Sequence, residues 1–294
     1  MKITNKLGLP DSIVQAVKND GYNSGKADIS VTQLIDPPRK IALEGANKNK
    51  LEEDAIDRIW SLLGQAVHTI LERAETKAIT EERLYADIGG WIISGQMDRI
   101  DVTQNGNGVK LDDYKVTSSY AVKNNQPKPE WVAQQNCYAQ LLRQNGYKVA
   151  SLGVVAILRD WSKLNVLRDP SYPKHQIAIV KIPLWSEQDA KTYMETRVRL
   201  HQDARNNELP LCTDEERWHK QDKFAVMKTG RKSALRVLDS LSAAEAWAKN
   251  HGHMDAMGNF STGFRIDHRV GEDVRCAHYC AAAPFCSQWN RVLV

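Results

Sequence analysis

The sequence predicts a mixed α/β fold in which helices flank a central sheet, and three observations indicate it. Apolar residues recur at helical spacing through residues 51–74. They recur again from Pro129 to a stop at Asn145-Gly146. Between these helical runs, the segment NGNG at 105–108 separates two stretches rich in Ile, Val, Met and Leu, which is a strong hairpin signal. A chain of 294 residues can bury a substantial core between such elements.

The same patterns predict the other elements in order. A Pro-Pro break interrupts the N-terminal segment. Much later in the chain, Ser186 is a suitable N-cap for the long amphipathic helix that begins after this serine. Beyond Cys212 a second hairpin turns at Thr229-Gly230, and a short helix and one more strand follow. The remaining predicted strands are a segment at 84–93, the hairpin arms near 92–103 and 109–117, SLGVVAILRD and HQIAIVKIPL.

This order divides the chain into three predicted parts. They are a core with N-terminal helices at 1–211, a small ββαβ-like α+β insert at 212–271 and a cysteine-rich C-terminal clasp at 272–294. The composition is that of a globular protein, with 42% hydrophobic and 26% charged residues. A formal charge of +4 permits nucleic acid as a partner without requiring it.

The sequence gives no sign of a membrane partner. It contains no apolar run long enough to span a bilayer, and its first residues, MKITNKLGLPDS, lack the apolar core of a signal peptide. We therefore expect a cytoplasmic location.

Two carboxylates and an ammonium share one face of the predicted hairpin. A two-residue turn at the first Asn-Gly pair sets Asp98 opposite Asp113, one at the second pair sets it opposite Thr117, and a four-residue loop sets it opposite Lys115. All three registers place Asp98, Asp113 and Lys115 on the same face. Their desolvation is costly unless a ligand needs them, and a divalent metal is such a ligand. The alternative is an exposed face with ordinary salt bridges.

Four segments in order resemble the RecB-like branch of the PD-(D/E)XK nuclease superfamily. They are GQAVH on a helix at 64–68, GQMD on a strand at 95–98, DYK on a strand at 113–115 and QQNCY on a helix at 134–138. The family pattern is a helix with a histidine, a GxxD strand, a (D/E)xK strand and a QxxxY helix. The resemblance covers roughly residues 30–205 and implies a restriction-endonuclease-like core.

The resemblance also implies catalytic and metal-binding roles. Asp98 and Asp113, with the backbone carbonyl of Tyr114, would bind Mg²⁺ or Mn²⁺, since hard cations prefer oxygen ligands. Lys115 would position or help deprotonate the attacking water and offset charge in the transition state. His68 would join the metal ligands. The alternative for His68 is a histidine satisfied at a helix–sheet interface.

Two residues on the second motif helix complete the predicted site. Gln134 and Tyr138 are one turn apart and share a face, where the family places them beside the active site. The alternative is a polar edge beside a core tyrosine, and Gln135 replaces Gln134 if the helix register differs. Asp101 and Asp112 are expected to be bystanders.

The cysteines predict a second metal site. The triplet Cys276, Cys280 and Cys286 resembles the iron-sulfur clasp of AddB-type and CRISPR-associated RecB-like nucleases. In those relatives a first cysteine precedes the helix histidine, and here the best substitute is Cys212. A [4Fe-4S] cluster held by these four thiolates is the main expectation, with zinc or no metal as alternatives. Cys137 is expected to be a small buried residue.

The insert contains a basic hairpin. Such a patch could track a phosphate backbone, although a solvated hairpin also explains a run of charges. A single acid, Asp222, lies among its six cations. The cations are Lys220, Lys223, Lys228, Arg231, Lys232 and Arg236.

These observations predict a metal-dependent deoxyribonuclease that acts as an exonuclease or processes DNA ends. Its substrate would be linear ends or single strands of DNA. The segments KFAVMKTGRKSALRV and RVGEDVRCAHYCAAAPFC also resemble phage-encoded members, which implies work in recombination, replication or repair in a host cytoplasm, beside proteins of those pathways. The alternatives are an inactive DNA-binding or assembly protein on the same fold, an endonuclease and an RNA-directed nuclease. Cleavage polarity and oligomeric state stay open.

Overall fold

The computed structural model describes residues 2–19, 25–75, 77–102 and 108–290. The chain divides into two compact units, Met1–Pro210 and Leu211–Val294, each described by itself below.

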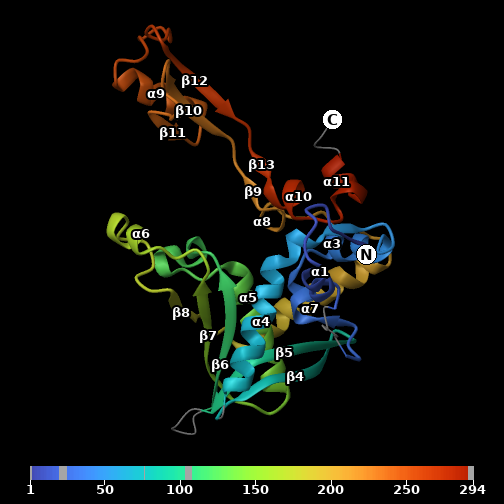
Figure 1. The fold of residues 1–294 in the computed structure, drawn as a ribbon. Coiled ribbons are helices and arrows are strands. Elements are labelled where there is room, and N and C mark those ends of the chain that lie inside the picture. Colours follow the sequence, from blue (N-terminus) through green and yellow to red (C-terminus); the bar gives the residue numbers. More distant parts are fainter. Residues whose placement is uncertain (1, 20–24, 76, 103–107, 291–294) are drawn as a thin grey trace. The chain divides into compact units, whose positions relative to one another are not determined.

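Unit 1 is built on a six-stranded mixed sheet with the order β2-β5-β6-β7-β8, in which β4 pairs with β5 (Figure 1). The β4–β5–β6 and β7–β8 pairs are antiparallel, whereas β2–β5 and β6–β7 are parallel. The fold class predicted from the sequence is therefore confirmed. The strands are β2 (Ile29–Ser30), β4 (Ile79–Ile88), β5 (Trp91–Val102), β6 (Val109–Thr117), β7 (Val149–Leu158) and β8 (Ile177–Ile182).

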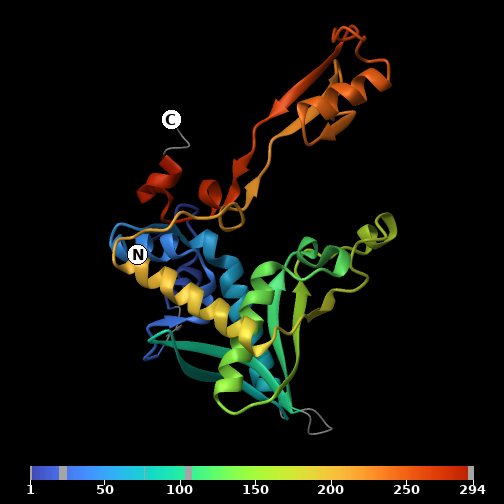
Figure 2. The ribbon, with the colours of Figure 1, turned by 180° about the vertical axis from the view of Figure 1, so that it is seen from behind.

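Helices cover both faces of this sheet. In Figures 1 and 2, α4 lies on one face, and α5 and α7 lie on the other. Ser186 caps α7, because its side chain accepts a hydrogen bond from the backbone N–H of Asp189. The remaining elements are short and lie before α4 or at the strand ends. The helical elements are α1 (Asp11–Lys18), α2 (Val31–Ile35), α3 (Pro38–Ala46), η1 (Ala55–Arg58), α4 (Ile59–Ala74), η2 (Ser119–Asn125), α5 (Pro129–Gln144), α6 (Lys163–Arg168) and α7 (Glu187–Arg205).

Two predicted boundaries are wrong. The helix predicted over 51–74 begins only at Ile59, because β3 (Glu52–Asp54) pairs with β1 (Lys2–Thr4) and occupies its expected start. The Asp54 carboxylate fixes this arrangement by accepting hydrogen bonds from the Thr4 hydroxyl at 2.7 Å and the Ile56 N–H at 3.2 Å. The strand predicted over 84–93 is β4, five residues earlier, because a Gly89-Gly90 turn with positive φ separates it from β5.

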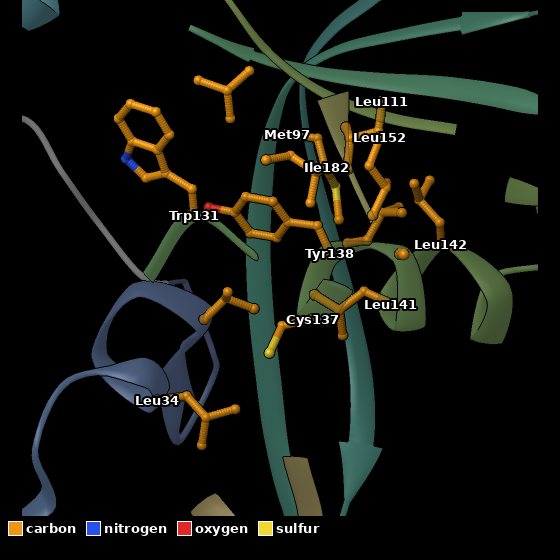
Figure 3. Close-up of a cluster of buried hydrophobic side chains, with 14 of the residues drawn as sticks. Leu34, Met97, Leu111, Trp131, Cys137, Tyr138, Leu141, Leu142, Leu152 and Ile182 are labelled. Carbon is orange, nitrogen blue, oxygen red and sulfur yellow. The ribbon is translucent and has the colours of Figure 1, made fainter. Parts of the chain in front are cut away.

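The core of unit 1 fixes α5 closely against the sheet. Figure 3 shows Tyr138, Leu141 and Leu142 of α5 among the buried side chains of neighbouring strands. Gly95 allows this close packing, since a Cβ atom at that position would lie 2.7 Å from Leu141 Cδ1 and 2.8 Å from the Tyr138 ring. The position of β5, which carries Asp98, therefore depends on contact with α5.

Unit 2 contains a three-stranded antiparallel sheet with the order β11-β10-β12. The elements of this sheet and its helix follow each other as ββαβ, the order expected for the insert. Ala244 and Ala248 of α9 pack against Val226 at the centre of the sheet. The ends of this segment are held together by the pairing of β9 with β13 and by two contacts to the Asp273 carboxylate, an ion pair from Arg217 and a hydrogen bond of 2.7 Å from His219 Nδ1. The elements are α8 (Asp214–Arg217), β9 (His219–Lys220), β10 (Lys223–Lys228), β11 (Arg236–Leu238), α9 (Leu241–Asn250), β12 (Phe264–Arg269), β13 (Glu272–Asp273), α10 (Val274–His278), η3 (Ala283–Phe285) and α11 (Ser287–Asn290).

Among the residues that the structure describes, no helix is both long and apolar enough to cross a membrane.

Candidate active site

Three adjacent strands place one carboxylate each on the face of the sheet that α4 covers. The pairs on either side of Glu81 in β4 set it opposite Asp98 in β5. The β5–β6 register, extended by one residue beyond the Arg99–Asp112 pair, sets Asp98 opposite Asp113. Because directly opposite residues point to the same face, the three carboxylates form a row across the sheet.

This register is one of the three predicted for the hairpin, the one set by a two-residue turn at the first Asn-Gly pair. That pair lies outside the described residues. The β5–β6 pairing itself ends at Arg99 and Asp112. Beyond this pair, the Asp98 carboxylate accepts a hydrogen bond of 2.7 Å from the Tyr114 N–H. A side-chain oxygen thus replaces the backbone carbonyl that would otherwise accept this hydrogen bond in the sheet.

The predicted residues meet in one pocket of about 700 Å³. His68 of α4 donates from Nε2 to the Tyr114 carbonyl at 3.0 Å, and its Nδ1 lies 3.5 Å from Asp98 Oδ1. Lys115 Nζ lies 2.8 Å from Asp113 Oδ2. The structure thus brings His68, Asp98, Asp113, the Tyr114 carbonyl and Lys115 together in this pocket.

Glu81 also belongs to this site, and the sequence analysis missed it. Its Oε1 lies 3.7 Å from His68 Nδ1, and ligand atoms of His68, Glu81 and Asp98 all lie within 4.8 Å of one another. The backbone of Glu81 has a φ of 51°, an unusual value for a residue with a side chain, and Gln96 donates to its Oε2 at 2.6 Å. The signal that could have revealed it is the acidic start of TEERLYADI, had the strand been predicted from residue 79.

The electrostatics of the pocket favour a bound cation. Burial, reinforced by the charge of Asp113, raises the pKa of Asp98 to about 7, although His68, Lys115 and the Tyr114 N–H oppose this rise. The Glu81 carboxylate, which acts as an acceptor beside the imidazole, raises the pKa of His68 in spite of its burial. Burial alone would lower the pKa of Lys115, but Asp113 and Asp98 outweigh it, and the net shift is upward. The neighbouring cations therefore do not fully neutralise the carboxylates of the pocket, and a bound proton or metal ion would supply the missing positive charge.

The motif helix places Gln134, rather than Gln135, in the pocket. Gln134 donates to the Tyr138 hydroxyl at 3.0 Å, and both residues line the pocket beside the carboxylates. Burial raises the pKa of Tyr138, so its hydroxyl stays protonated. Gln135 is fully buried, and its amide makes no hydrogen bond within the described structure.

The two expected bystanders lie away from this site. Asp112 projects from the other face and pairs with Lys110 at 2.8 Å and Arg99 at 3.3 Å. Asp101 also pairs with Arg99, at 3.0 Å.

The four clasp cysteines belong to unit 2. Burial raises the pKa of Cys276 to about 11, and the nearby Cys280 and Cys286 add to this rise. The backbone of Cys212 is joined to the Gln288 amide by two hydrogen bonds of 2.9 Å. Within the described chain none of the four forms a disulfide, and no three of their sulfurs lie within 4.8 Å of one another. Cys137 is a small buried residue in α5, and burial raises its pKa to about 12.

Carboxylates, an imidazole and an ammonium on a mixed sheet are typical of enzymes that use a hard divalent cation. Comparison with known families is more specific, because the model of the PD-(D/E)XK nuclease superfamily matches residues 52–287. The chain belongs to this superfamily, which implies a nuclease that acts on nucleic acid. The superfamily predicted from the four motifs is therefore confirmed.

Solved structures resemble parts of the chain. The crystal structure of SSO0001 has 20% sequence identity and a TM-score of 0.44, and the match covers 64% of this chain and 84% of that one. A candidate exonuclease from Eubacterium rectale has 14% identity and a TM-score of 0.32, with 51% and 55% of the two chains covered. A search of the curated proteins found no match.

Proposed function

We propose that the protein is a divalent-metal-dependent deoxyribonuclease of the RecB-like branch that degrades or trims DNA from its ends. The observation that carries the proposal is the convergence of Asp98, Asp113, His68 and Lys115 in one pocket, in a chain of the PD-(D/E)XK superfamily. The four motifs in order support the RecB-like branch.

The residues of the pocket fit Mg²⁺ or Mn²⁺. Asp98, Asp113 and the Tyr114 carbonyl offer oxygen ligands, His68 offers a nitrogen, and Glu81 adds a carboxylate within reach of Asp98 and His68. The raised pKa of Asp98 supports this fit, because a cation would offset the charge that burial opposes. When bound, the metal polarises the phosphate and activates water for phosphodiester hydrolysis.

Lys115 acts beside the metal as a positive charge. Because Asp113 and Asp98 raise its pKa, it is an ammonium at neutral pH. In this form it holds the attacking water by a donated hydrogen bond and stabilises the charge that develops on the phosphate oxygens. The Gln134–Tyr138 pair supplies fixed polar groups beside the carboxylates, where they can contact the DNA backbone.

The preference for ends rests on family resemblance, since RecB-like relatives mostly process ends and no separate target-recognition domain is evident in the sequence. Resemblance to phage members supports a role in phage recombination, replication or repair. For the cysteines we propose a [4Fe-4S] cluster bound by Cys212, Cys276, Cys280 and Cys286, with zinc as the alternative. The spacing of the cysteine triplet, which resembles the iron-sulfur clasp of related nucleases, supports it. Ligation would stabilise unit 2 and would not supply the catalytic metal.

The function is tested with purified protein, Mg²⁺ or Mn²⁺, and the same DNA in end-labelled linear and covalently closed circular form. We expect the linear form to be shortened from its ends while the circle stays intact. Cleavage of the circle would make the protein an endonuclease. Binding without any cleavage, or cleavage of RNA alone, would contradict the proposal and favour an inactive binding protein or an RNA-directed nuclease.

A further inference from the structure

A row of neighbouring aromatic rings extends from α9 to β12 in unit 2. The centroids of His251 and Trp247 are 4.0 Å apart, those of Trp247 and His253 are 5.7 Å apart, and those of His253 and Phe264 are 4.1 Å apart. Lys228 Nζ lies 5.3 Å from the Phe264 centroid and ends the row with a positive charge. His251 is exposed at the other end of the row.

The backbone holds these rings in place. His251 is the C-cap of α9, one turn after Trp247, and the Trp247 carbonyl accepts a hydrogen bond of 2.8 Å from His251 Nδ1. The N–H of His253 donates to the Ala248 carbonyl at 2.8 Å, which turns the chain back toward β12 and Phe264. The row is therefore arranged before any ligand binds.

Unpaired cations gather at the same end of the sheet as Lys228 and Phe264. The turn between β10 and β11 is joined to the start of β12 by a hydrogen bond of 2.7 Å from Thr229 N–H to the Gly263 carbonyl. Residues 228–236 contain no acidic side chain. Four cations of this segment are exposed and, within the described structure, make no ion pair: Lys228, Arg231, Lys232 and Arg236.

Two other cations of the sheet are compensated by neighbouring acids. Lys223 pairs with Asp239, and Arg265 pairs with Asp267 at 2.7 Å. Asp222, the acid of the predicted hairpin, instead accepts hydrogen bonds from His268 and the Gly271 N–H. Ion pairs therefore compensate Lys223 and Arg265 of the sheet and leave the turn positive.

We propose that this surface, Lys228 to Arg236 with the ring row, binds single-stranded DNA. The cations would contact successive phosphates, and the exposed ring of His251 would stack with an unpaired base, a combination that suits single strands. The choice of DNA over RNA rests on the proposed function, whereas the surface itself does not depend on the nuclease pocket. The unit would thus hold a strand that the nuclease domain degrades.

The test measures binding of the full-length protein to fluorescently labelled oligothymidylate in EDTA, by anisotropy over a series of salt concentrations. We expect the Arg231→Gln, Lys232→Gln, Arg236→Gln triple variant to lose roughly a hundredfold in affinity near 0.1 M salt. Its log–log salt slope should fall by about 2, at about 0.7 per lost phosphate contact. The matched control removes three exposed cations of unit 1, by Lys181→Gln, Lys191→Gln and Arg199→Gln, and should keep the slope.

His251→Ala separates base stacking from charge. It should weaken binding roughly fivefold or more while leaving the salt slope unchanged, and labelled duplex should bind more weakly than the single strand. A triple variant with wild-type affinity and slope, checked for folding by circular dichroism, would overturn the proposal. The proposal would also be overturned if the unit 1 control lost as much affinity as the triple variant, or if His251→Ala kept full affinity for the oligonucleotide. Since EDTA prevents cleavage, a protein that binds through this surface but never cuts DNA would contradict the proposed function alone.

Discussion

The charge on Asp98 destabilises the metal-free protein, and its removal should reveal this. Its side chain is only 10% exposed, and burial together with Asp113 raises its pKa from 3.8 to about 7. Asparagine has nearly the same shape and can still accept the Tyr114 N–H through its carbonyl oxygen. We therefore expect Asp98→Asn to be more stable than the wild type in EDTA at pH 8, and to have lost metal-dependent cleavage.

The size of the effect follows from the pKa. A rise of about 3 pKa units corresponds to a gain in the free energy of unfolding of Asp98→Asn of at most about 4 kcal/mol. This gain is smaller in practice because His68 and Lys115 lose a negative charge beside them in the variant. Because the folded pKa lies above the unfolded value, the folded state holds an extra proton between about pH 4 and pH 7. The stability of the metal-free wild type should therefore fall as pH rises through this window.

Thermal unfolding followed by circular dichroism, in EDTA at pH 5 and pH 8, measures this difference. Asp98→Asn should melt several degrees above the wild type at pH 8, and the gap should narrow at pH 5. Added Mg²⁺ should raise the melting temperature of the wild type but not of the variant. Asp101→Asn, on the same strand but outside the pocket, is the control and should show no such gain. An Asp98→Asn protein that is less stable than the wild type at pH 8 in EDTA would refute the reasoning.

Three further predictions concern the site and its supports. Glu81→Gln should raise the Mg²⁺ concentration for half-maximal cleavage roughly tenfold or more, since a charged oxygen near the metal is lost; an unchanged metal titration would remove Glu81 from the site. Gly95→Ala should lower the free energy of unfolding in urea by about 1–3 kcal/mol and should lower activity, because the new Cβ meets Tyr138 and Leu141. A Gly95→Ala protein as stable as the wild type would show that α5 can shift without cost to make room for the Cβ. Cys280→Ser should show no bound metal in elemental analysis and should melt at a lower temperature than the wild type. A wild-type protein that contains no metal and is no more stable than Cys280→Ser would exclude the clasp.

The sheet face that carries the candidate site could be predicted because its composition depends on local rules. Side chains alternate along a strand, so Asp98, Asp113 and Lys115 share a face in every even register of the hairpin. Helix α5 has a proline at its start and an Asn-Gly stop, which bound the segment that carries Gln134 and Tyr138. These features need no knowledge of distant parts of the chain.

The parts that sequence reasoning missed depend on pairing between segments. Glu81 enters the site only because β4 pairs with β5 in a register that sets it opposite Asp98. Residues 52–54 leave the helical pattern only because β1, fifty residues earlier, pairs with them. The pairing of β9 with β13 likewise joins the ends of the insert through contacts between segments far apart in the chain.

The central claim is that this pocket cleaves DNA with a divalent metal, and one measurement tests it most directly. It is the Mn²⁺-dependent release of labelled nucleotides from linear DNA by the wild type, Lys115→Ala and Lys110→Ala. The two lysines lie on β6, but Lys115 contacts Asp113 in the pocket and Lys110 pairs with Asp112 on the other face. We expect release to be lost with EDTA and in Lys115→Ala, while folding is kept and Lys110→Ala retains near wild-type activity. Full activity of Lys115→Ala, or release that continues in EDTA, would contradict it.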